Sequence, residues 1–449
     1  MPDTEQQFNI PTDEFSPSDL RDAWQVLTHQ DRVQGFRMLP VGTADDFFFS
    51  LEAGEQVELL SVFTPGERRT YMRLLPPDDA ADVLQTAEPP EFRDELLAQL
   101  DDNTRREVIA LMAYAEDAAG GLMNPRFARV RADMSIDEAL SYLRRQAREK
   151  VETVYYAYAL DAQQKLLGVV SLRELFQSQP QNKVRDVMSK AEDMITVLDS
   201  LDQEAVSHVF QEHDLAAVPV VDADGRMKGI VTVDDIVDVV QEEATEDIQK
   251  VGGMEALDAS YFETSFLSMI RKRGGWLTVL SLGQMLTITA MGHFADEIEK
   301  AVVLSLFLPL IISSGGNSGS QASTLIIRSL ALGEMRLADW SRVFRRELAS
   351  GLVLGGILGV VGLLRVTGWH YFFGAYGAHW SGIGLTVGIS LVGIVLWGTL
   401  AGALLPFALR RFKLDPASAS APLVATLVDI SGVIIYFAVA TAILTGTML

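Results

Sequence analysis

The chain has no cysteine among its 449 residues, which excludes disulfides, thiolate chemistry and cysteine-ligated zinc. It has only six histidines, and it shows no nucleophile–base pair, no P-loop and no metal-hydrolase spacing. An enzyme is therefore the least favoured class. The first fifteen residues lack the basic and apolar regions of a secretory signal, so we expect the N-terminal half to be cytoplasmic.

Positive charge is scarce in the first half of the chain. Residues 1–250 hold 24 Lys and Arg against 49 Asp and Glu, a net of −25, whereas residues 251–449 hold 13 against 11, a net of +2. An acidic surface often serves only solubility. Beside a hydrophobic half, however, it favours a cation sensor connected to a cation pathway.

Charged residues are absent from long stretches of the second half. Residues 274–292, 301–327, 348–364 and 366–409 contain none, and residues 416–449 contain only Asp429. A helix needs about 20 apolar residues to cross a bilayer. We therefore predict five spans and a Gly/aromatic loop at 368–382; the spans lie near 274–292, 301–330, 347–367, 383–409 and 421–446.

Basic clusters orient these spans. Lys and Arg gather before the first span, between the second and third, and between the fourth and fifth, at residues 271–273, 336–346 and 410–413. Cytoplasmic loops carry an excess of Lys and Arg, so all three clusters are placed on the side of the soluble half. Five spans then put the C-terminus outside a cell (inner) membrane.

A small polar run, residues 313–321, interrupts the second span. Helix-breaking polar backbone at membrane depth is tolerated where protein buries it or where it lines a water-filled cavity. Close helix packing through small residues is the alternative; it explains the glycines well, but Asn317 and Gln321 poorly. The run therefore predicts a pore lining in which the glycines serve both purposes.

Asp429 is an isolated carboxylate in the last span. Placing a charge there costs roughly 2.5–3.5 kcal/mol on the insertion scale, and such residues usually mark an ion or proton path. The alternative is a protonated Asp hydrogen-bonded between helices. Oxygen ligands without sulfur favour Mg²⁺ or Ca²⁺, and Mg²⁺ would be held through its hydration shell.

A duplicated module organises residues 126–248. Residues 161–175 match residues 222–236 at a constant offset of 61, and each copy predicts strand, turn, strand and helix after an amphipathic helix at 136–148 or 203–213. The pattern resembles tandem CBS domains, whose cleft often binds adenine nucleotides. That resemblance implies an ATP-like ligand near Thr232, Asp235 and Tyr158. The alternative is a CBS pair that serves only for dimerisation, and Ser171 with Glu174 departs from the pattern in the first copy.

Residues 15–115 lack strand alternation and predict short helices. Leu39-Pro40 and Leu75-Pro76-Pro77 each precede an acidic pair, Asp45-Asp46 and Asp78-Asp79, which we expect at helix starts because the dipole favours carboxylates there. The densest acidic stretch, residues 234–247, predicts one helix with like charges on a face. Such charges repel by a few tenths of a kcal/mol per pair, and a bridging divalent cation would reverse that sign.

Four local motifs and their order resemble the MgtE family of magnesium channels along essentially the whole chain. The motifs are Glu116-Asp-x-Ala-Gly-Gly-Leu-Met123, Glu243-Ala-Thr-Glu-Asp247, Gly315-Gly-Asn-x-Gly319 and Pro422-Leu-Val-Ala-Thr-Leu-x-Asp429. One departure is Ser320, where the family has Asn. The resemblance implies an all-α helical-repeat N-domain (1–125), an α/β CBS pair (126–188 and 189–248), a connecting plug helix (249–270) and a five-helix transmembrane domain (271–449).

The same resemblance implies a homodimer with one pore for Mg²⁺, closed when cytosolic Mg²⁺ bridges acidic surfaces of the N-domain, CBS pair and plug. It assigns the pore to Asp429, Asn317, Ala425, Gly316 and Gln321. It assigns regulatory Mg²⁺ to Asp214, Asp235, Asp238, Glu243, Glu246, Asp247, Asp415 and Glu204. Two other readings stay open: a proton-coupled divalent cation transporter and a non-conducting CBS membrane sensor. The lipid bilayer and divalent cations are the expected partners, and nucleic acid is not.

Overall fold

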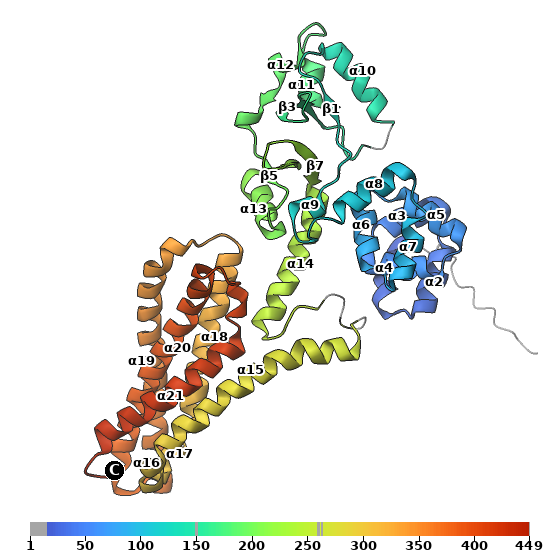
Figure 1. Cartoon of the computed structure of the whole chain (residues 1–449). Helices are drawn as coiled ribbons and strands as arrows, with labels where there is room; N and C mark the ends of the chain where they lie inside the picture. The colour runs from blue at the N-terminus through green and yellow to red at the C-terminus, as the bar shows by residue number, and fades with distance from the viewer. Residues whose placement is uncertain (1–15, 149–150, 258–260, 262–263, 449) are drawn as a thin grey trace, which may run out of the picture. The chain divides into compact units, whose positions relative to one another are not determined.

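The computed structural model describes residues 16–148, 151–257, 261 and 264–448, and the chain forms two compact units, residues 1–240 and 241–449 (Figure 1). The first unit holds short helices followed by two α/β modules. The second holds the end of a connecting helix and a set of long apolar helices. The predicted order of a helical N-terminal part, two α/β modules, a connecting helix and long apolar helices is confirmed.

Short helices make up the N-terminal part of the first unit. They are α1 (Pro17–Ala23), η1 (Trp24–Val26), α2 (His29–Met38), α3 (Val41–Phe49), α4 (Ala53–Val62), α5 (Pro65–Leu74), α6 (Pro77–Thr86), α7 (Pro90–Leu97), α8 (Asp102–Leu111) and α9 (Ala119–Leu122). Several begin at side-chain caps. Before α5, for example, Thr64 and Glu67 exchange hydrogen bonds with each other's backbone N–H, which fixes the first turn.

Leu-Pro pairs mark helix starts, as predicted. Asp78-Asp79 lies in the first turn of α6, directly after Pro77. The same prediction was wrong for Asp45-Asp46, because α3 begins at Val41, immediately after Pro40, and the two aspartates therefore lie in the middle of the helix. Pro40 lacks an N–H and suits the entry to a helix, so it sets the start earlier than the acidic pair suggested.

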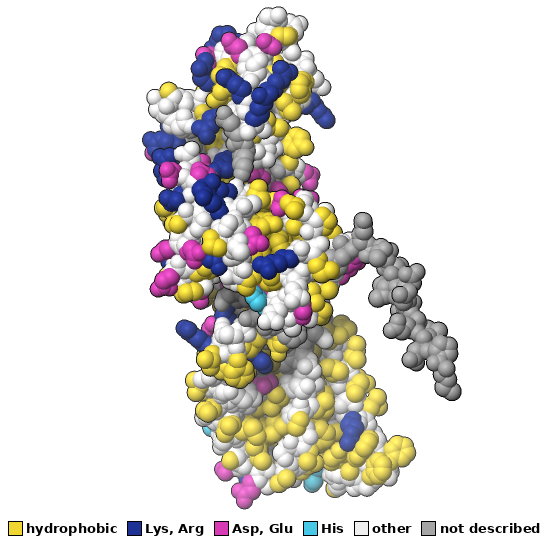
Figure 2. Space-filling model, turned by 90° about the vertical axis from the view of Figure 1, so that its right-hand side faces the viewer, with side chains coloured by type: hydrophobic (Ala, Val, Ile, Leu, Met, Phe, Trp, Pro, Cys, Tyr) yellow, Lys and Arg dark blue, Asp and Glu magenta, His cyan; other side chains and the backbone are white. Residues whose placement is uncertain are grey.

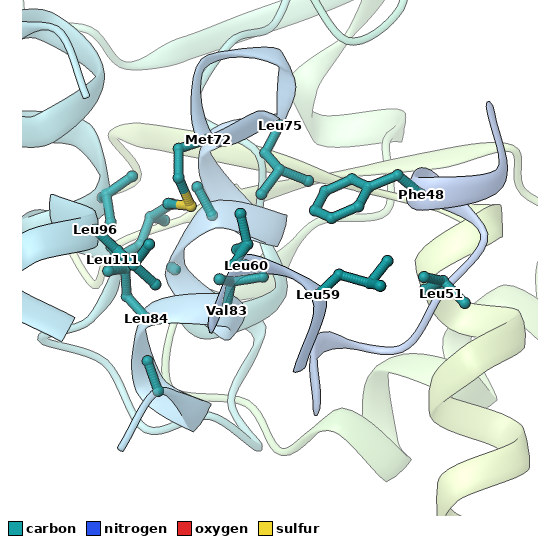
Figure 3. Packing of buried hydrophobic residues seen from close by; sticks show 14 of the residues in the cluster. Phe48, Leu51, Leu59, Leu60, Met72, Leu75, Val83, Leu84, Leu96 and Leu111 are labelled. Atoms are coloured by element: carbon teal, nitrogen blue, oxygen red, sulfur yellow. The ribbon is translucent and has the colours of Figure 1, made fainter. Parts of the chain in front are cut away.

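Leucines and aromatic residues from successive helices form the core of this part. Phe48, Leu60, Met72, Leu84 and Leu96 converge in Figure 3, and none of them is exposed to solvent. The same hydrophobic cluster extends into the second α/β module. The helical part and that module therefore share buried apolar surface, whose removal from water stabilises their contact.

The two α/β modules repeat one topology. The first contains β1 (Arg129–Val130), α10 (Ile136–Gln146), β2 (Tyr156–Leu160), β3 (Leu166–Ser171), α11 (Leu172–Gln177), α12 (Val184–Val187) and β4 (Ser189–Lys190); the second contains η2 (Ala191–Asp193), β5 (Val197–Leu198), α13 (Gln203–His213), β6 (Ala217–Val221) and β7 (Met227–Thr232). Strand order is β1-β2-β3-β4 and β5-β6-β7. Ala157 pairs with Val170 and Val218 with Val231, so the offset of 61 is kept in the register.

The connecting helix differs from its predicted bounds of 249–270. Helix α14 (Val233–Val251) starts directly after β7, carries the whole acidic stretch, and ends before Gly252. Gly253 has φ +77°, a left-handed conformation that stops the helix and that glycine adopts without strain. The prediction that residues 234–247 form one helix is confirmed.

Four helical segments are long and apolar enough to cross a membrane by length and composition: Val302–Ala331, Leu337–Phe373, Gly377–Arg411 and Ala421–Leu444. They contain α17 (Val302–Ser305), α18 (Leu308–Ala331), η3 (Leu337–Asp339), α19 (Trp340–Phe373), η4 (Gly377–His379), α20 (Trp380–Arg411) and α21 (Ala421–Leu444), with η5 (Pro416–Ser418) before the last. Figure 2 shows hydrophobic side chains over much of the visible face of this unit. Four predicted spans therefore coincide with long apolar helices.

The first predicted span lies in α15 (Phe266–His293), one continuous helix of 28 residues that is followed by α16 (Ala295–Lys300). Helix α15 is not among the four segments that are apolar enough to cross a membrane, because its composition is more polar. The first span therefore stays a prediction. The predicted loop at 368–382 was too long, because α19 continues to Phe373 and α20 begins at Trp380. Both helices thus take in aromatic residues of the predicted loop, such as Tyr371 and Trp380, a residue type that is enriched at membrane–water interfaces.

Glycines let the membrane helices approach closely. A Cβ on Gly319 of α18 would lie 2.9 Å from the carbonyl oxygen of Gly398 on α20, and one on Gly359 of α19 would lie 2.8 Å from that of Gly388 on α20. Small residues commonly provide such contacts in membranes. Residues 313–321 accordingly lie within the continuous helix α18, so the expected helix-breaking backbone was wrong.

We expect Leu60→Ala to lower the stability of the first unit by about 2–5 kcal/mol, because the substitution leaves a cavity in a fully buried site. Thermal unfolding of the purified chain would show a lower midpoint for that unit. Val62→Ala is the control, since Val62 ends the same helix and is 39% exposed. Equal shifts for the two variants would contradict the assigned core.

Candidate functional site

Asp429 lies on α21 beside a glycine of α18. Its Oδ1 would be 3.7 Å from a Cβ built on Gly316, and the same Cβ would be 3.4 Å from the Cβ of Ala425, one helical turn before Asp429. A Cβ there would make ordinary van der Waals contacts, so the glycine leaves the room of one methyl group next to the carboxylate. The structure therefore brings together three of the five predicted pore residues.

A neighbouring helix, α15, supplies a hydrogen-bond partner to this carboxylate. Gln284 of α15 donates from Nε2 to Asp429 Oδ2 over 3.3 Å. An amide orients a carboxylate without neutralising it, so the charge of Asp429 still calls for a cation or a proton. Sequence reasoning missed Gln284, although it is the lone side-chain amide in the predicted span 274–292.

Asn317 and Gln321 are exposed on α18, one turn apart. Asn317 donates from Nδ2 to Ser313 Oγ over 3.3 Å, within its own helix. Ser320 donates to the carbonyl oxygen of Ala421 over 3.1 Å and so links α18 to the start of α21. The polar face is thus adjacent to the Asp429 helix, and no described hydrogen bond joins Asn317 or Gln321 to Asp429 itself.

Six carboxylates lie close enough within the first unit to influence one another's ionisation. Asp79 of α6 is affected by Glu152, which precedes β2, and by Asp234, Asp235 and Asp238 of α14; Asp78 belongs to the same group. We call these residues the acidic cluster: Asp78, Asp79, Glu152, Asp234, Asp235 and Asp238. Only Asp235 and Asp238 were predicted as ligands; Asp78-Asp79 was singled out only as a helix start, and Glu152 gave no signal.

Burial makes the acidic cluster unfavourable in its fully ionised form. Burial, reinforced by neighbouring carboxylates, raises the pKa of Asp78 well above its ordinary value and that of Asp79 to about 7. For Asp235, burial outweighs two hydrogen bonds from Thr232 that act in the opposite direction, and the pKa rises to about 6. Burial also raises the pKa of Glu152 and Asp238.

One amide joins two of these carboxylates. Asn124 donates from Nδ2 to Asp78 Oδ1 over 3.1 Å and to Glu152 Oε2 over 2.7 Å. Asn124 is buried, and its backbone N–H and C=O bond those of Ile230 on β7, so its position is fixed. It connects α6, the segment before β2 of the first module and the sheet of the second module.

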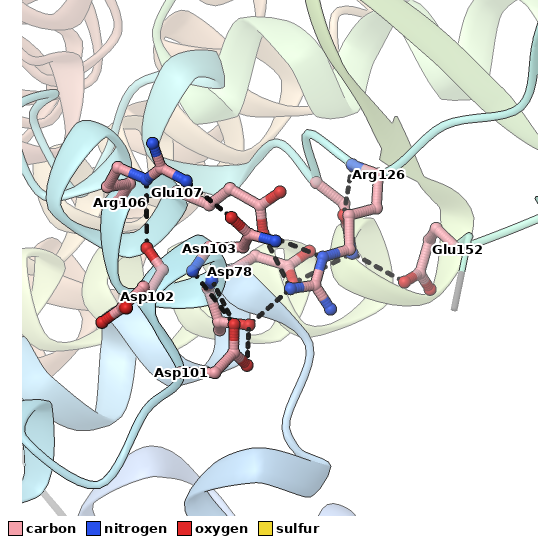
Figure 4. Close-up of polar contacts among 10 residues, drawn as sticks. Asp78, Asp101, Asp102, Asn103, Arg106, Glu107, Arg126 and Glu152 are labelled. Carbon is pink, nitrogen blue, oxygen red and sulfur yellow. Dashed lines mark hydrogen bonds and ion pairs between the residues drawn. The ribbon is translucent and has the colours of Figure 1, made fainter. Parts of the chain in front are cut away.

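The nearby guanidinium of Arg126 bonds residues outside the acidic cluster. It donates from Nε to Glu107 over 2.9 Å and from one terminal nitrogen to Thr104 Oγ1 over 2.6 Å (Figure 4). Within the described residues, no group of three or more His, Asp and Glu is arranged to hold a bare metal ion. The acidic cluster offers negative charge and carboxylate oxygen atoms, the ligand type that Mg²⁺ prefers.

The remaining predicted regulatory residues are dispersed. Glu204 lies in the first turn of α13, 3.9 Å from His208, and the exposed Asp214 caps the end of that helix with φ +50°. Glu243 and Asp247 are half-buried on α14. Glu246 and Asp415 both pair with Lys250, a residue that the sequence interpretation did not single out.

The predicted nucleotide residues each have a contact within the chain. Thr232 donates to Asp235 over 2.7 Å at the start of α14, and Ser171 donates to Glu174 over 2.7 Å at the start of α11. Helix capping accounts for both pairs. Tyr158 is 1% exposed and packs edge-on against Phe127 in a hydrophobic cluster.

Comparisons with known proteins cover the whole described architecture. Family models match residues 15–117 (MgtE intracellular N domain), 119–180 and 184–242 (CBS domain) and 308–439 (MgtE, divalent cation transporter). The chain is 40% identical to magnesium transporter MgtE of Thermus thermophilus over 96% of its length and 94% of that protein. It is 29% identical to magnesium transporter MgtE of Bacillus subtilis over 97% of its length and 93% of that protein.

A solved structure, the cytosolic domain of the Mg²⁺ channel MgtE in complex with ATP, is also similar. It shares 39% sequence identity, with a TM-score of 0.47, over 50% of this chain and 91% of that one.

The acidic cluster predicts opposite effects of pH and divalent cations on the first unit. A raised folded-state pKa means that the folded state binds more protons, so without metal its stability falls as pH rises from about 4 to about 7. Mg²⁺ at pH 8 should restore several degrees of the lost unfolding temperature, because it neutralises the same carboxylates.

Thermal unfolding in EDTA at pH 5.5 and pH 8, and at pH 8 with Mg²⁺, measures both effects. The Asp79→Asn/Asp235→Asn variant should show smaller responses to pH and to Mg²⁺. Asp102→Asn is the control, because Asp102 is an exposed carboxylate outside the acidic cluster. Unchanged responses in the double variant would contradict the cluster's role.

Proposed function

This chain belongs to the MgtE family of magnesium transporters, and from that premise we propose that it forms a homodimeric, Mg²⁺-selective channel that cytosolic Mg²⁺ closes. The observation that carries the proposal is Asp429, a half-buried carboxylate inside an apolar helix, next to the space left by Gly316. Such a carboxylate has lost much of its hydration, so a bound cation would stabilise it. The premise makes that cation Mg²⁺.

The ion would pass Asp429 with part of its water shell. Mg²⁺ sheds water reluctantly, and a carboxylate with small neighbours binds a hydrated ion better than a tight cage would. Gly316 and Ala425 are the small neighbours here. A second copy of the chain would place a second Asp429 across the axis, and the exposed Asn317 and Gln321 would line the path between the subunits.

Closure would depend on carboxylates in the soluble half. At low Mg²⁺ the acidic cluster repels itself, and Mg²⁺ would replace that repulsion with bridging attraction. Swinging a two-state equilibrium from 1:99 to 99:1 needs about 5.5 kcal/mol, which several weak sites of ~1 kcal/mol could supply. Asp214, Glu204, Glu243 and Asp247 are the other proposed contributors. Helix α14 carries part of the cluster and leads along the chain into the membrane helices.

The proposal includes an orientation and a second ligand. The basic loops favour a soluble half in the cytoplasm and a C-terminus outside the cell membrane, with α15 as the first of five spans. An adenine nucleotide at the CBS pair would use Thr232 and Asp235, whose capping bond it would have to replace.

Isothermal titration calorimetry with ATP tests this site. Thr232→Val should raise the Kd for ATP at least about tenfold, because a hydrogen bond to the ribose is lost.

Asp429→Asn should reduce Mg²⁺ uptake into liposomes by at least about tenfold, because removing the charge lowers cation affinity in a poorly hydrated site. Mg²⁺-sensitive dye inside the liposomes gives the rate. Glu334→Gln is the matched control, since it neutralises an exposed carboxylate between α18 and η3. Full uptake by Asp429→Asn would contradict its assignment to the ion path, and uptake that requires a proton gradient would favour the proton-coupled transporter.

Currents from excised patches test the gate. Mg²⁺ currents should appear at low cytosolic Mg²⁺ and decline as it rises to several millimolar, since weak carboxylate sites respond in that range. Asp79→Asn/Asp235→Asn should need a higher concentration for closure. Currents that ignore cytosolic Mg²⁺ would reject the gate but keep the pore, whereas the absence of current under all conditions would favour the sensor reading.

A further inference from the structure

Lys250 lies near the C-terminal end of α14 and binds two carboxylates. Its Nζ donates to Asp415 Oδ2 over 2.6 Å and pairs with Glu246, one turn earlier on the same helix. Asp415 precedes η5, the turn that leads into α21. The sequence resemblance assigned both carboxylates to regulatory Mg²⁺, yet an ammonium group of the chain itself already lies between them.

The surroundings of this bridge are closely packed. Val251 contacts the cluster formed by Ala417, Ala419 and Ile327. A Cβ on Gly253 would lie 2.9 Å from Pro422 of α21 and 3.0 Å from Trp276 of α15, so only a glycine fits there. The end of α14 is thus seated against the start of the helix that carries Asp429.

Hydrogen bonds connect the same residues to the beginning of α21. Trp276 donates from Nε1 to Ser420 Oγ over 3.3 Å, and Ser420 caps α21 by accepting from the N–H of Leu423. Asp415 divides its oxygens between two tasks: Oδ1 accepts from the N–H of Ala417 over 2.8 Å, and Oδ2 accepts from Lys250. The ion pair is therefore built into the turn before the pore helix.

The electrostatics favour a permanent ammonium. The Lys250 ammonium contacts both carboxylates, so each negative charge lies directly beside the positive one. Charge-assisted hydrogen bonds of this kind are about twice as strong as neutral ones. Because Lys250 belongs to the same chain as its partners and shares α14 with Glu246, it meets them at a high effective concentration, whereas a Mg²⁺ ion must arrive from solution.

We propose that Lys250 is the resident cation of the Glu246–Asp415 pair, excludes Mg²⁺ from it, and ties the end of α14 to the start of α21 at every Mg²⁺ concentration. This inference rests on the proposed function, because it gives α14 a fixed attachment through which its displacement reaches the pore helix. The regulatory Mg²⁺ would then act at other carboxylates. Lys250 is a positioning residue, since it acts on Asp429 through α21 and contacts no permeating ion.

The absence of native cysteine makes this attachment measurable. Spin labels on Ile248→Cys and Phe412→Cys would report the separation of α14 from the loop before η5, and both side chains are exposed, at 73% and 76%. Labelled chains are diluted with unlabelled chains, so that only distances within a chain are observed. Double electron–electron resonance is recorded in EDTA and in excess Mg²⁺.

With Lys250 present, we expect one narrow distance distribution that does not change with Mg²⁺. With Lys250→Met, the two carboxylates lose their cation, so the distribution should broaden in EDTA and narrow again when Mg²⁺ binds in its place. Lys250→Arg should restore the Mg²⁺-independent distribution, which a loss of packing alone would not explain. Asp415→Asn keeps an acceptor for the η5 turn but should broaden the distribution in both conditions.

Lys413→Met is the matched control, because it removes a neighbouring exposed ammonium from the same loop. A Lys250→Met distribution that stays narrow without Mg²⁺ would overturn the inference, as would a distribution that changes with Mg²⁺ while Lys250 is present. Mg²⁺ uptake by the labelled protein is measured separately. The expected distances without Mg²⁺ uptake would reject the proposed channel and keep the Lys250 attachment. Mg²⁺ uptake together with a Lys250→Met distribution that does not depend on Mg²⁺ would reject the attachment and keep the channel.

Discussion

Carboxylates in poorly hydrated positions are the constraint on which this protein depends, because each must be balanced by something. The structure shows three kinds of arrangement. Glu246 and Asp415 form ion pairs with a lysine of the chain, Lys250. Asp429 receives an uncharged amide, and the acidic cluster includes two carboxylates that share the single amide of Asn124. The amide partners leave negative charge, and these are the places where an external cation has most to contribute.

The soluble and membrane parts of the chain apply that constraint differently. In the first unit, the shared hydrophobic core holds the N-terminal helices against the second α/β module and so keeps like charges together. Burial of apolar surface thus stabilises the contact between the helices and the module, whereas the carboxylates that it brings together repel one another. The stability of this contact therefore depends on pH and on cations. In the membrane part, hydration is limited by lipid and by helix packing, and one carboxylate is enough to define a preferred position for a cation.

Much of this architecture could be predicted because it follows from local sequence patterns, namely a repeat and uncharged stretches. The offset of 61 predicted two modules with matching strand registers, and uncharged stretches predicted four of the apolar helices. The cluster of Asp78 with Asp235 could not be predicted, because it depends on how α6 and α14 pack across a separation of more than a hundred residues. The polar run was misread as a helix breaker, since its glycines gave no indication that they would meet another backbone. Lys250 was overlooked because a single lysine among acidic residues resembles ordinary surface charge.

The glycine contacts of α18, α19 and α20 have a mechanical consequence. Where backbone touches backbone, no side chain can change rotamer to absorb a shift, so these three helices should behave as one stiff body. Any opening of an ion path must then occur by sliding or tilting of elements outside that body. Helix α21 meets it along one side and α15 lies beyond, almost unburied, with Gln284 reaching across to Asp429. The stiffness of one group of helices thus limits the movement of the whole membrane part to very few degrees of freedom.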